Sequence, residues 1–206
     1  MKRTFLRFLV FLASSVSLQA IAQYKPPPRN LQFDTLTWVA TWEAPRRVLL
    51  DEHFEDVVFP PANWQDTTQG MGWFATSNGS SPALAIPPHT NYAVVNNDLA
   101  TVVNNGCCDY LITPEMNLTQ AGAYTLSFNS FFRGLDAESA TVEISTDGGN
   151  TWELLLQVLP HFTWATLTVD LSQYSGPAGA QHVKIAFKAN DNGNANATGW
   201  AIDDVA

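Results

Sequence analysis

The sequence predicts an all-β fold, an antiparallel sandwich. Short runs of alternating apolar and polar residues recur in residues 124–132, 140–144, 166–171 and 182–188. Turn-forming Gly, Asn, Asp and Pro residues separate these runs, as they do between strands. No segment carries a convincing apolar period of 3.6 residues, so helices are not expected. Short strands divided by turns are typical of a β-sandwich.

The first 22 residues have the three parts of a secretory signal peptide. Basic residues stand at positions 2, 3 and 7, a short apolar run covers 8–16, and Ala-Ile-Ala at 20–22 precedes the expected cleavage point. The apolar run is too short to cross a bilayer, and no later segment is apolar enough to do so. We therefore expect a secreted, extracellular protein without membrane insertion, with attachment to the cell surface left open.

Residues 23–47 are predicted to form a Pro-rich leader ahead of one main domain at 48–206. Residues 36–45 of the leader are similar to the opening strands of a fibronectin type III domain. A segment this short cannot fold as a domain of its own, so it is interpreted as a strand remnant. The main domain is long and apolar enough to bury a core.

Alternation assigns the strands of the main domain to faces. The side chains expected to point inward are Leu126, Phe128, Phe132, Leu167, Val169, Leu171, Val183, Ile185 and Phe187. Lys184 and Lys188 are expected to point outward. Residues 64–105 are less regular and are predicted to form long loops over the sandwich, where binding surfaces commonly lie.

The charge balance excludes some partners. The chain has a formal net charge of −9, and the signal segment holds three of its ten Lys and Arg but none of its nineteen Asp and Glu. Nucleic acids and anionic membranes are bound through clustered Lys and Arg, so neither is expected as a partner. An acidic surface suits calcium, which prefers carboxylate and carbonyl oxygens, although acidity also serves solubility.

The two cysteines, Cys107 and Cys108, are adjacent and cannot link distant segments. Three states stay open in an oxidising compartment: a vicinal disulfide, which we favour, reduced thiols, or pairing with another chain. Without a second Cys/His cluster, a structural zinc is not expected.

Residues 145–152, Ser-Thr-Asp-Gly-Gly-Asn-Thr-Trp, fit the Asp-box pattern of sialidases. A single copy without an arginine cluster is better interpreted as a hairpin turn. No nucleophile elbow, zinc-protease helix or phosphate loop is present, and the four histidines are scattered, so no catalytic residue is predicted. Each histidine is interpreted as a surface or packing residue.

The end of the chain, Gly199-Trp-Ala-Ile-Asp-Asp-Val205, is predicted to be a strand that carries carboxylates. Alternation places Trp200, Ile202 and Asp204 on one face and Ala201, Asp203 and Val205 on the other. Both faces look apolar, so a carboxylate enters the core whichever face is inside. A buried carboxylate must protonate, find a cation or bind a metal, and the chain has few cationic side chains.

Seven tryptophans in an acidic exported β protein suggest that sugars stack on exposed rings. Trp73 and Trp164, both near predicted loops, are the candidate ligand-binding platforms. Trp152 and Trp200 are interpreted as core residues, because tryptophan is mostly buried on average.

A series of segments resembles the cleaved-adhesin or choice-of-anchor J family of MAM-like jelly rolls, known from gingipain adhesin regions. The series comprises residues 50–56 (Leu-Asp-Glu-His-Phe-Glu-Asp), 59–64, 72–73, 109–118 (with Leu-Ile-Thr-Pro), 124–128, 169–176 and 199–205. The resemblance covers about residue 48 to the end, in the family's order. Members usually continue past the last strand, so truncation at the C-terminal end stays open.

This resemblance implies that the antiparallel sandwich is a two-sheet jelly roll, with its first and last strands adjacent and a structural calcium near them. Carried over by position, the candidate ligands are Glu55 with Asp203 or Asp204, then Glu52, Asp56 and Asp98. It also implies an adhesion or accessory module of an exported bacterial protein.

We therefore predict a non-catalytic, calcium-stabilised extracellular module that recognises glycans or host and matrix proteins. The alternatives are an accessory domain of a secreted hydrolase, such as a peptidase, with its catalytic part outside this chain, and a structural spacer.

Overall fold

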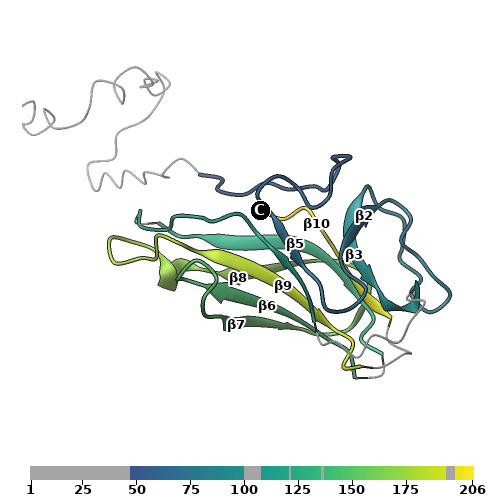
Figure 1. Ribbon diagram of the computed structural model, residues 1–206. Coiled ribbons are helices and arrows are strands. Elements are labelled where there is room, and N and C mark those ends of the chain that lie inside the picture. The colour runs from purple at the N-terminus through teal and green to yellow at the C-terminus, as the bar shows by residue number, and fades with distance from the viewer. Residues whose placement is uncertain (1–46, 100–107, 121, 136, 194–197) are drawn as a thin grey trace, which may run out of the picture. The chain divides into compact units, whose positions relative to one another are not determined.

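The computed structural model describes residues 47–99, 108–120, 122–135, 137–193 and 198–206 (Figure 1). The predicted signal peptide and nearly all of the predicted leader lie outside these residues. Within them the chain forms ten strands in two five-stranded antiparallel sheets, so the predicted all-β jelly-roll sandwich is confirmed. The described helices are two short 3-10 turns, η1 (Asn97–Leu99) and η2 (Ser172–Tyr174). No described helix has the length and apolarity needed to span a bilayer.

The first sheet has the strand order β1-β4-β9-β6-β7. Its strands are β1 (Gln65–Thr67), β4 (Asp109–Ile112), β9 (Lys184–Asn190), β6 (Ser139–Ser145) and β7 (Glu153–Val158). β9 is the middle strand of this sheet, and it pairs with β6 over seven positions.

The second sheet has the order β2-β3-β10-β5-β8 and places the last strand at its centre. Its strands are β2 (Phe74–Thr76), β3 (Tyr92–Asn96), β10 (Gly199–Asp203), β5 (Thr125–Phe132) and β8 (His161–Asp170). Figure 1 shows β10 between β3 and β5, with the C-terminal end beside the segment that opens the described chain.

The main core lies between the two sheets and contains the side chains that alternation assigned to it. Phe128, Phe187 and Trp200 meet there, with Phe187 packed edge-on against Phe128 and tilted against Trp200. All three are essentially unexposed, and burying each contributes roughly 1.5–3 kcal/mol of transfer free energy. Lys184 and Lys188 alternate with buried neighbours and point outward, as predicted.

A second, smaller core lies on the outer face of the second sheet. Leu84 and Ile86, from the segment between β2 and β3, pack with Tyr92, Phe131 and Ala201 of that sheet. The predicted loops over the sandwich therefore exist, but residues 64–105 also contain β1, β2 and β3. β3 was not predicted from the sequence, because its five residues are all buried and show no alternation.

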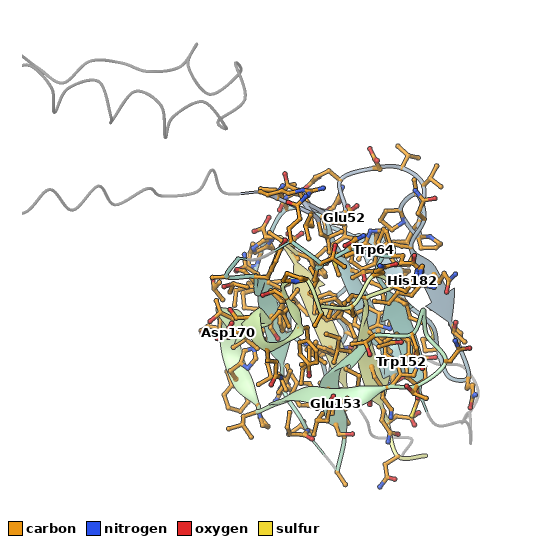
Figure 2. The ribbon with its side chains drawn as sticks, turned by 90° about the vertical axis from the view of Figure 1, so that its left-hand side faces the viewer. Glu52, Trp64, Trp152, Glu153, Asp170 and His182 are labelled. Carbon is orange, nitrogen blue, oxygen red and sulfur yellow. The ribbon has the colours of Figure 1, made fainter. Side chains whose placement is uncertain are left out.

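The Asp-box forms the hairpin turn that was expected of it. Asp147 Oδ1 accepts hydrogen bonds from the backbone amides of Asn150 and Thr151 at 3.0 and 2.9 Å, and Oδ2 accepts one from the Thr151 hydroxyl. These donors lower the pKa of Asp147. Figure 2 shows Trp152 and His182 on the side of the molecule where this turn lies, and the amide of Gly148 donates to the His182 carbonyl.

Gly199 is the position where β10 comes closest to its neighbour. Its φ is +135°, and a Cβ there would lie 2.0 Å from the Val95 carbonyl oxygen. We expect Gly199→Ala to destabilise the domain by roughly 2–4 kcal/mol, because backbone rather than a flexible side chain must move. Gly193 also has a positive φ, +68°, but open space around it, so Gly193→Ala should cost only about 1 kcal/mol. Urea unfolding of both variants measures the difference, and equal losses would contradict this account.

Candidate metal centre

The backbone turns sharply where β10 ends. Asp203 is the last residue of the strand, and Asp204 has a φ of +50°, which is uncommon for a residue other than glycine. Trp200 and Ile202 point into the main core, as expected, and Ala201 into the outer core. Because Asp204 interrupts the alternation, Val205 returns to the main core, so its predicted position on the face of Asp203 is wrong.

Asp203 is the buried carboxylate that the sequence predicted. Its exposure is 0%, and burial raises its pKa to about 6. One carboxylate oxygen lies 2.8 Å from His89 Nδ1 and accepts the Thr90 hydroxyl at 3.2 Å, while the other accepts the Asp204 amide at 2.8 Å. Within the described ranges no Lys or Arg forms an ion pair with it.

Asp204 extends the centre toward the start of the described chain. His53 Nδ1 lies 2.6 Å from Asp204 Oδ1, and Asn129 Nδ2 donates to Oδ2 at 2.6 Å. The hydrogen bond to Asp204 raises the pKa of His53, whose other ring nitrogen lies 3.2 Å from Asp51. Asp204 therefore links β5, through Asn129, to the segment before Phe54, through His53.

Glu55 reaches the same corner through Asn91. Its two carboxylate oxygens accept the backbone amide and the side-chain amide of Asn91, both at 3.0 Å. Asn91 directly follows His89 and Thr90, the two side chains that contact Asp203. Glu55 thus holds in place the segment that lies over Asp203.

The two ends of the described chain are joined by backbone pairing, as the resemblance implied. The amide of Glu52 donates to the Val205 carbonyl at 2.9 Å, and the reverse bond is 2.8 Å long. The Glu52 carboxylate turns back to accept the Phe54 amide at 2.7 Å. Glu52 therefore takes part through its backbone, and its side chain serves the local turn.

Asp98 does not belong to this corner, which corrects one predicted ligand. It follows β3 at the end that pairs with Gly199, whereas Asp203 lies at the other end of β10, about 13 Å away along the strand. Its carboxylate instead accepts the Ala83 amide at 2.9 Å. Asp56 is exposed, and no described contact joins it to Asp203.

The described residues contain a metal-competent group made of His89, Asp203 and Asp204, whose ligand atoms lie within 4.8 Å of one another. The carboxylates suit calcium, which takes oxygen ligands, and the buried charge of Asp203 needs a cation. The His89 nitrogen is not a calcium ligand, and Glu55 lies outside the group. The two carboxylates are ligands of the kind that calcium takes, and His89 is a neighbour that competes for Asp203.

His89 and His53 were missed as members of a site. Neither has a spacing signal, since His89 follows two prolines in a segment predicted as loop and His53 is an isolated histidine. Only the way the chain folds over β10 brings them to the carboxylates. His53 does precede Phe54-Glu55, which the resemblance placed beside the last strand, and this was the one available signal.

The structure corrects one of the two predicted ligand platforms. Trp73 is 4% exposed in the main core, where its ring packs edge-on against Trp200 and its indole N–H donates to the Asp109 carbonyl. It cannot serve as a surface platform. Trp164 is half-buried on β8, its ring is tilted against the His89 ring with centroids 4.3 Å apart, and its indole N–H donates to the Pro87 carbonyl.

Cys108 is disulfide-bonded. Cys107 lies outside the described residues, so the vicinal pairing of the two stays a prediction.

Fold and site together define an all-β sandwich with a carboxylate centre at the junction of its first and last segments. Similar solved structures include two cleaved adhesin domains of Lys-gingipain from Porphyromonas gingivalis W83. The K1 domain is 23% identical, with 76% of this chain and 95% of that chain covered and a TM-score of 0.51. The K3 domain is also 23% identical, with 76% and 96% covered and a TM-score of 0.50.

At this identity the likeness is one of fold, and it agrees with the predicted adhesin-type sandwich. TmCBM61, solved with β-1,4-galactotriose, has a TM-score of only 0.49 at 15% identity, with 78% of this chain and 97% of that chain covered. That likeness is too low to inform the ligand. No protein-family model matches the sequence, and no curated protein matches it either.

Glu138 is a half-buried carboxylate at the other end of β10. One of its oxygens accepts the Thr198 hydroxyl at 2.8 Å, and the other is buried without a hydrogen-bond partner. Burial raises the pKa of Glu138 from 4.5 to about 7. The folded state therefore holds this proton more tightly than the unfolded state, so stability falls as pH rises from about 4.5 to about 7.

We expect Glu138→Gln to remove that fall. Relative to the unmutated chain, the variant should gain roughly 1–3 kcal/mol of unfolding free energy between pH 5 and pH 8. Urea unfolding at the two pH values measures the gain, with Asp56→Asn, at an exposed position, as control. A difference independent of pH would contradict the assignment.

Proposed function

We propose that this chain is a non-catalytic extracellular binding module, stabilised by calcium, that recognises a glycan or a host or matrix protein. Its likeness in fold to the cleaved adhesin domains of Lys-gingipain, over 95% and 96% of those chains, supports the adhesin-type module. The expected signal peptide supports export, and the acidic composition argues against nucleic acid as a partner.

The observation that carries the calcium proposal is the burial of Asp203 at a junction between chain ends. Asp203 is fully buried, and the partners described for it are neutral donors and one histidine. Asp203 and Asp204 would hold the ion, and Glu55 would join them if its hydrogen bonds to Asn91 were exchanged for the ion. A cation there would neutralise the buried charge and join Phe54-Glu55 to the end of β10.

The alternative is an accessory domain of a secreted hydrolase whose catalytic part lies outside this chain. It is favoured by the fact that the similar domains are parts of a larger protein, Lys-gingipain. An accessory domain and an adhesin can share the same binding surface, so the two differ in what is attached to the module. A longer gene sequence would distinguish them.

Calcium should raise the stability of the metal-free domain. A ligand that binds only the folded state stabilises it by about 2.7 kcal/mol at 100 times its Kd and about 4.1 kcal/mol at 1,000 times. We expect a rise of this order in unfolding free energy when calcium is added after chelation, and its loss in Asp203→Asn. Thermal and urea unfolding measure it, with magnesium as the ion control.

The matched control variant is Glu115→Gln. Glu115 also pairs with a histidine, at 2.7 Å from His182 Nδ1, but lies outside the metal-competent group. This variant should keep the full calcium response. A melting temperature of the unmutated domain that is the same with chelator and with calcium would overturn the calcium proposal and leave the binding module untouched.

A further inference from the structure

One outward face of the sandwich carries an ordered row of polar and aromatic side chains. The register pairs Thr67 with Tyr110, Tyr110 with Lys188, Lys188 with Thr141, and Thr141 with Gln157. Each of the five strands of the first sheet supplies one residue. We call these five residues the cross-strand row.

The row points away from the main core. Its members alternate along their strands with the buried residues Leu111, Phe187 and Val142. Thr67 and Gln157 at its two ends are exposed, and the three central residues are half-buried. Neighbouring strands lie about 4.8 Å apart, so the row extends for about 19 Å across the sheet.

The centre of the row combines a ring with charges that cancel. Lys188 Nζ lies 5.4 Å from the centroid of the Tyr110 ring and 3.1 Å from the Glu143 carboxylate in the adjacent row. The Thr141 hydroxyl donates to the same carboxylate oxygen at 3.4 Å. The centre of the row therefore offers donors, acceptors and an aromatic surface with its two charges paired to each other, on a chain whose formal net charge is −9.

This chemistry selects among ligands. An anionic ligand would have to draw Lys188 away from Glu143, and an apolar one would bury both charges without new partners. A neutral polyhydroxylated chain can donate to Glu143, accept from Lys188 and rest an apolar face on Tyr110. Its repeated hydroxyls also suit polar groups that recur from strand to strand.

The outer face of the other sheet is not equally available. Leu84 and Ile86 cover it with a second core, and Trp164 is engaged with His89, Tyr92 and Phe131. The polar groups that stay accessible on the second sheet, Thr166 and Thr168 of β8 beside Asn129 and Ser127 of β5, span two strands, whereas the row on the first sheet spans five.

We propose that the cross-strand row binds a neutral oligosaccharide lying across the strands of the first sheet, with Tyr110 as its platform. This inference rests on the proposed binding module and names both its ligand class and its surface. It moves the ligand site from the two predicted tryptophans to a tyrosine on the opposite sheet.

Affinity electrophoresis of the full chain in gels with soluble neutral polysaccharides tests the proposal, with heparin as an anionic control. We expect retardation by at least one neutral polysaccharide and none by heparin. Gln157→Ala, at an exposed position, should weaken that retardation several-fold. Tyr110→Ala should weaken it about tenfold, as is common for aromatic residues that anchor an interface.

Matched controls separate the row from general damage. Gln173→Ala changes an exposed glutamine in η2, and Tyr124→Ala changes a half-buried tyrosine outside the row; both should bind as the unmutated chain does. Amide chemical-shift mapping on the unmutated chain, with the retarding polysaccharide's oligosaccharide, needs no variant and should centre on β4, β6 and β9.

Retardation that survives in both Tyr110→Ala and Gln157→Ala overturns the row and leaves a glycan-binding module elsewhere on the surface. Retardation by heparin alone overturns the neutral ligand. No retardation in any gel overturns the oligosaccharide and leaves the protein-binding form of the proposed function.

Discussion

The pairing of β10 with β3 on one side and β5 on the other is the interaction on which this structure depends. Through Trp200 and Ile202, β10 fills the main core, and through Ala201 it forms part of the outer core. The residues just beyond it pair with Glu52 and Ser127. A five-residue strand thus joins two cores and both ends of the described chain, and its glycine start lets it approach β3 closely.

The unfavourable free energy of this arrangement is concentrated at the end of β10, at Asp203 and Asp204. Burying Asp203 and holding Asp204 at a positive φ are both unfavourable, and such features persist only when surrounding contacts enforce them. Here two histidines, Asn129 and the segment held by Glu55 supply those contacts. The candidate metal centre therefore lies where the fold closes, whereas the cross-strand row, for which we propose recognition, lies on the other sheet. On these proposals, stability and binding belong to separate surfaces.

The sequence predicted the features that follow from the alternation of apolar and polar residues along a strand. Alternation identified the inward residues of β5 and β9, and the final strand with its buried carboxylate, because each shows its pattern within a few residues. Alternation did not reveal the positive φ at Asp204, because no residue type in this segment indicates it. Val205 was therefore assigned to the wrong face. The resemblance brought Glu55 near Asp203, but the histidines come together only because the segment before β3 folds over the sheet.

Trp73 and the cross-strand row were also misjudged or missed, because the fold brings together segments that are distant in the sequence. Trp73 was interpreted as a surface platform because it lies near predicted loops, yet its ring lies in the main core. The cross-strand row escaped notice because its members are spread from Thr67 to Lys188, and only the register of five strands aligns them. A local sequence pattern indicates the direction in which a side chain points. It does not indicate which distant segment that side chain contacts.

The strand order also has a consequence for how the molecule forms. The centre of the second sheet is filled by its last strand, so β3 and β5 cannot complete their pairing until residues 199–203 exist. Two strands must therefore wait with unsatisfied backbone edges while the rest of the chain is made. Such non-local pairing folds slowly and leaves those edges open to other chains in the meantime. A chain that crosses a membrane from its N-terminal end would therefore acquire its final shape only after its last strand had emerged.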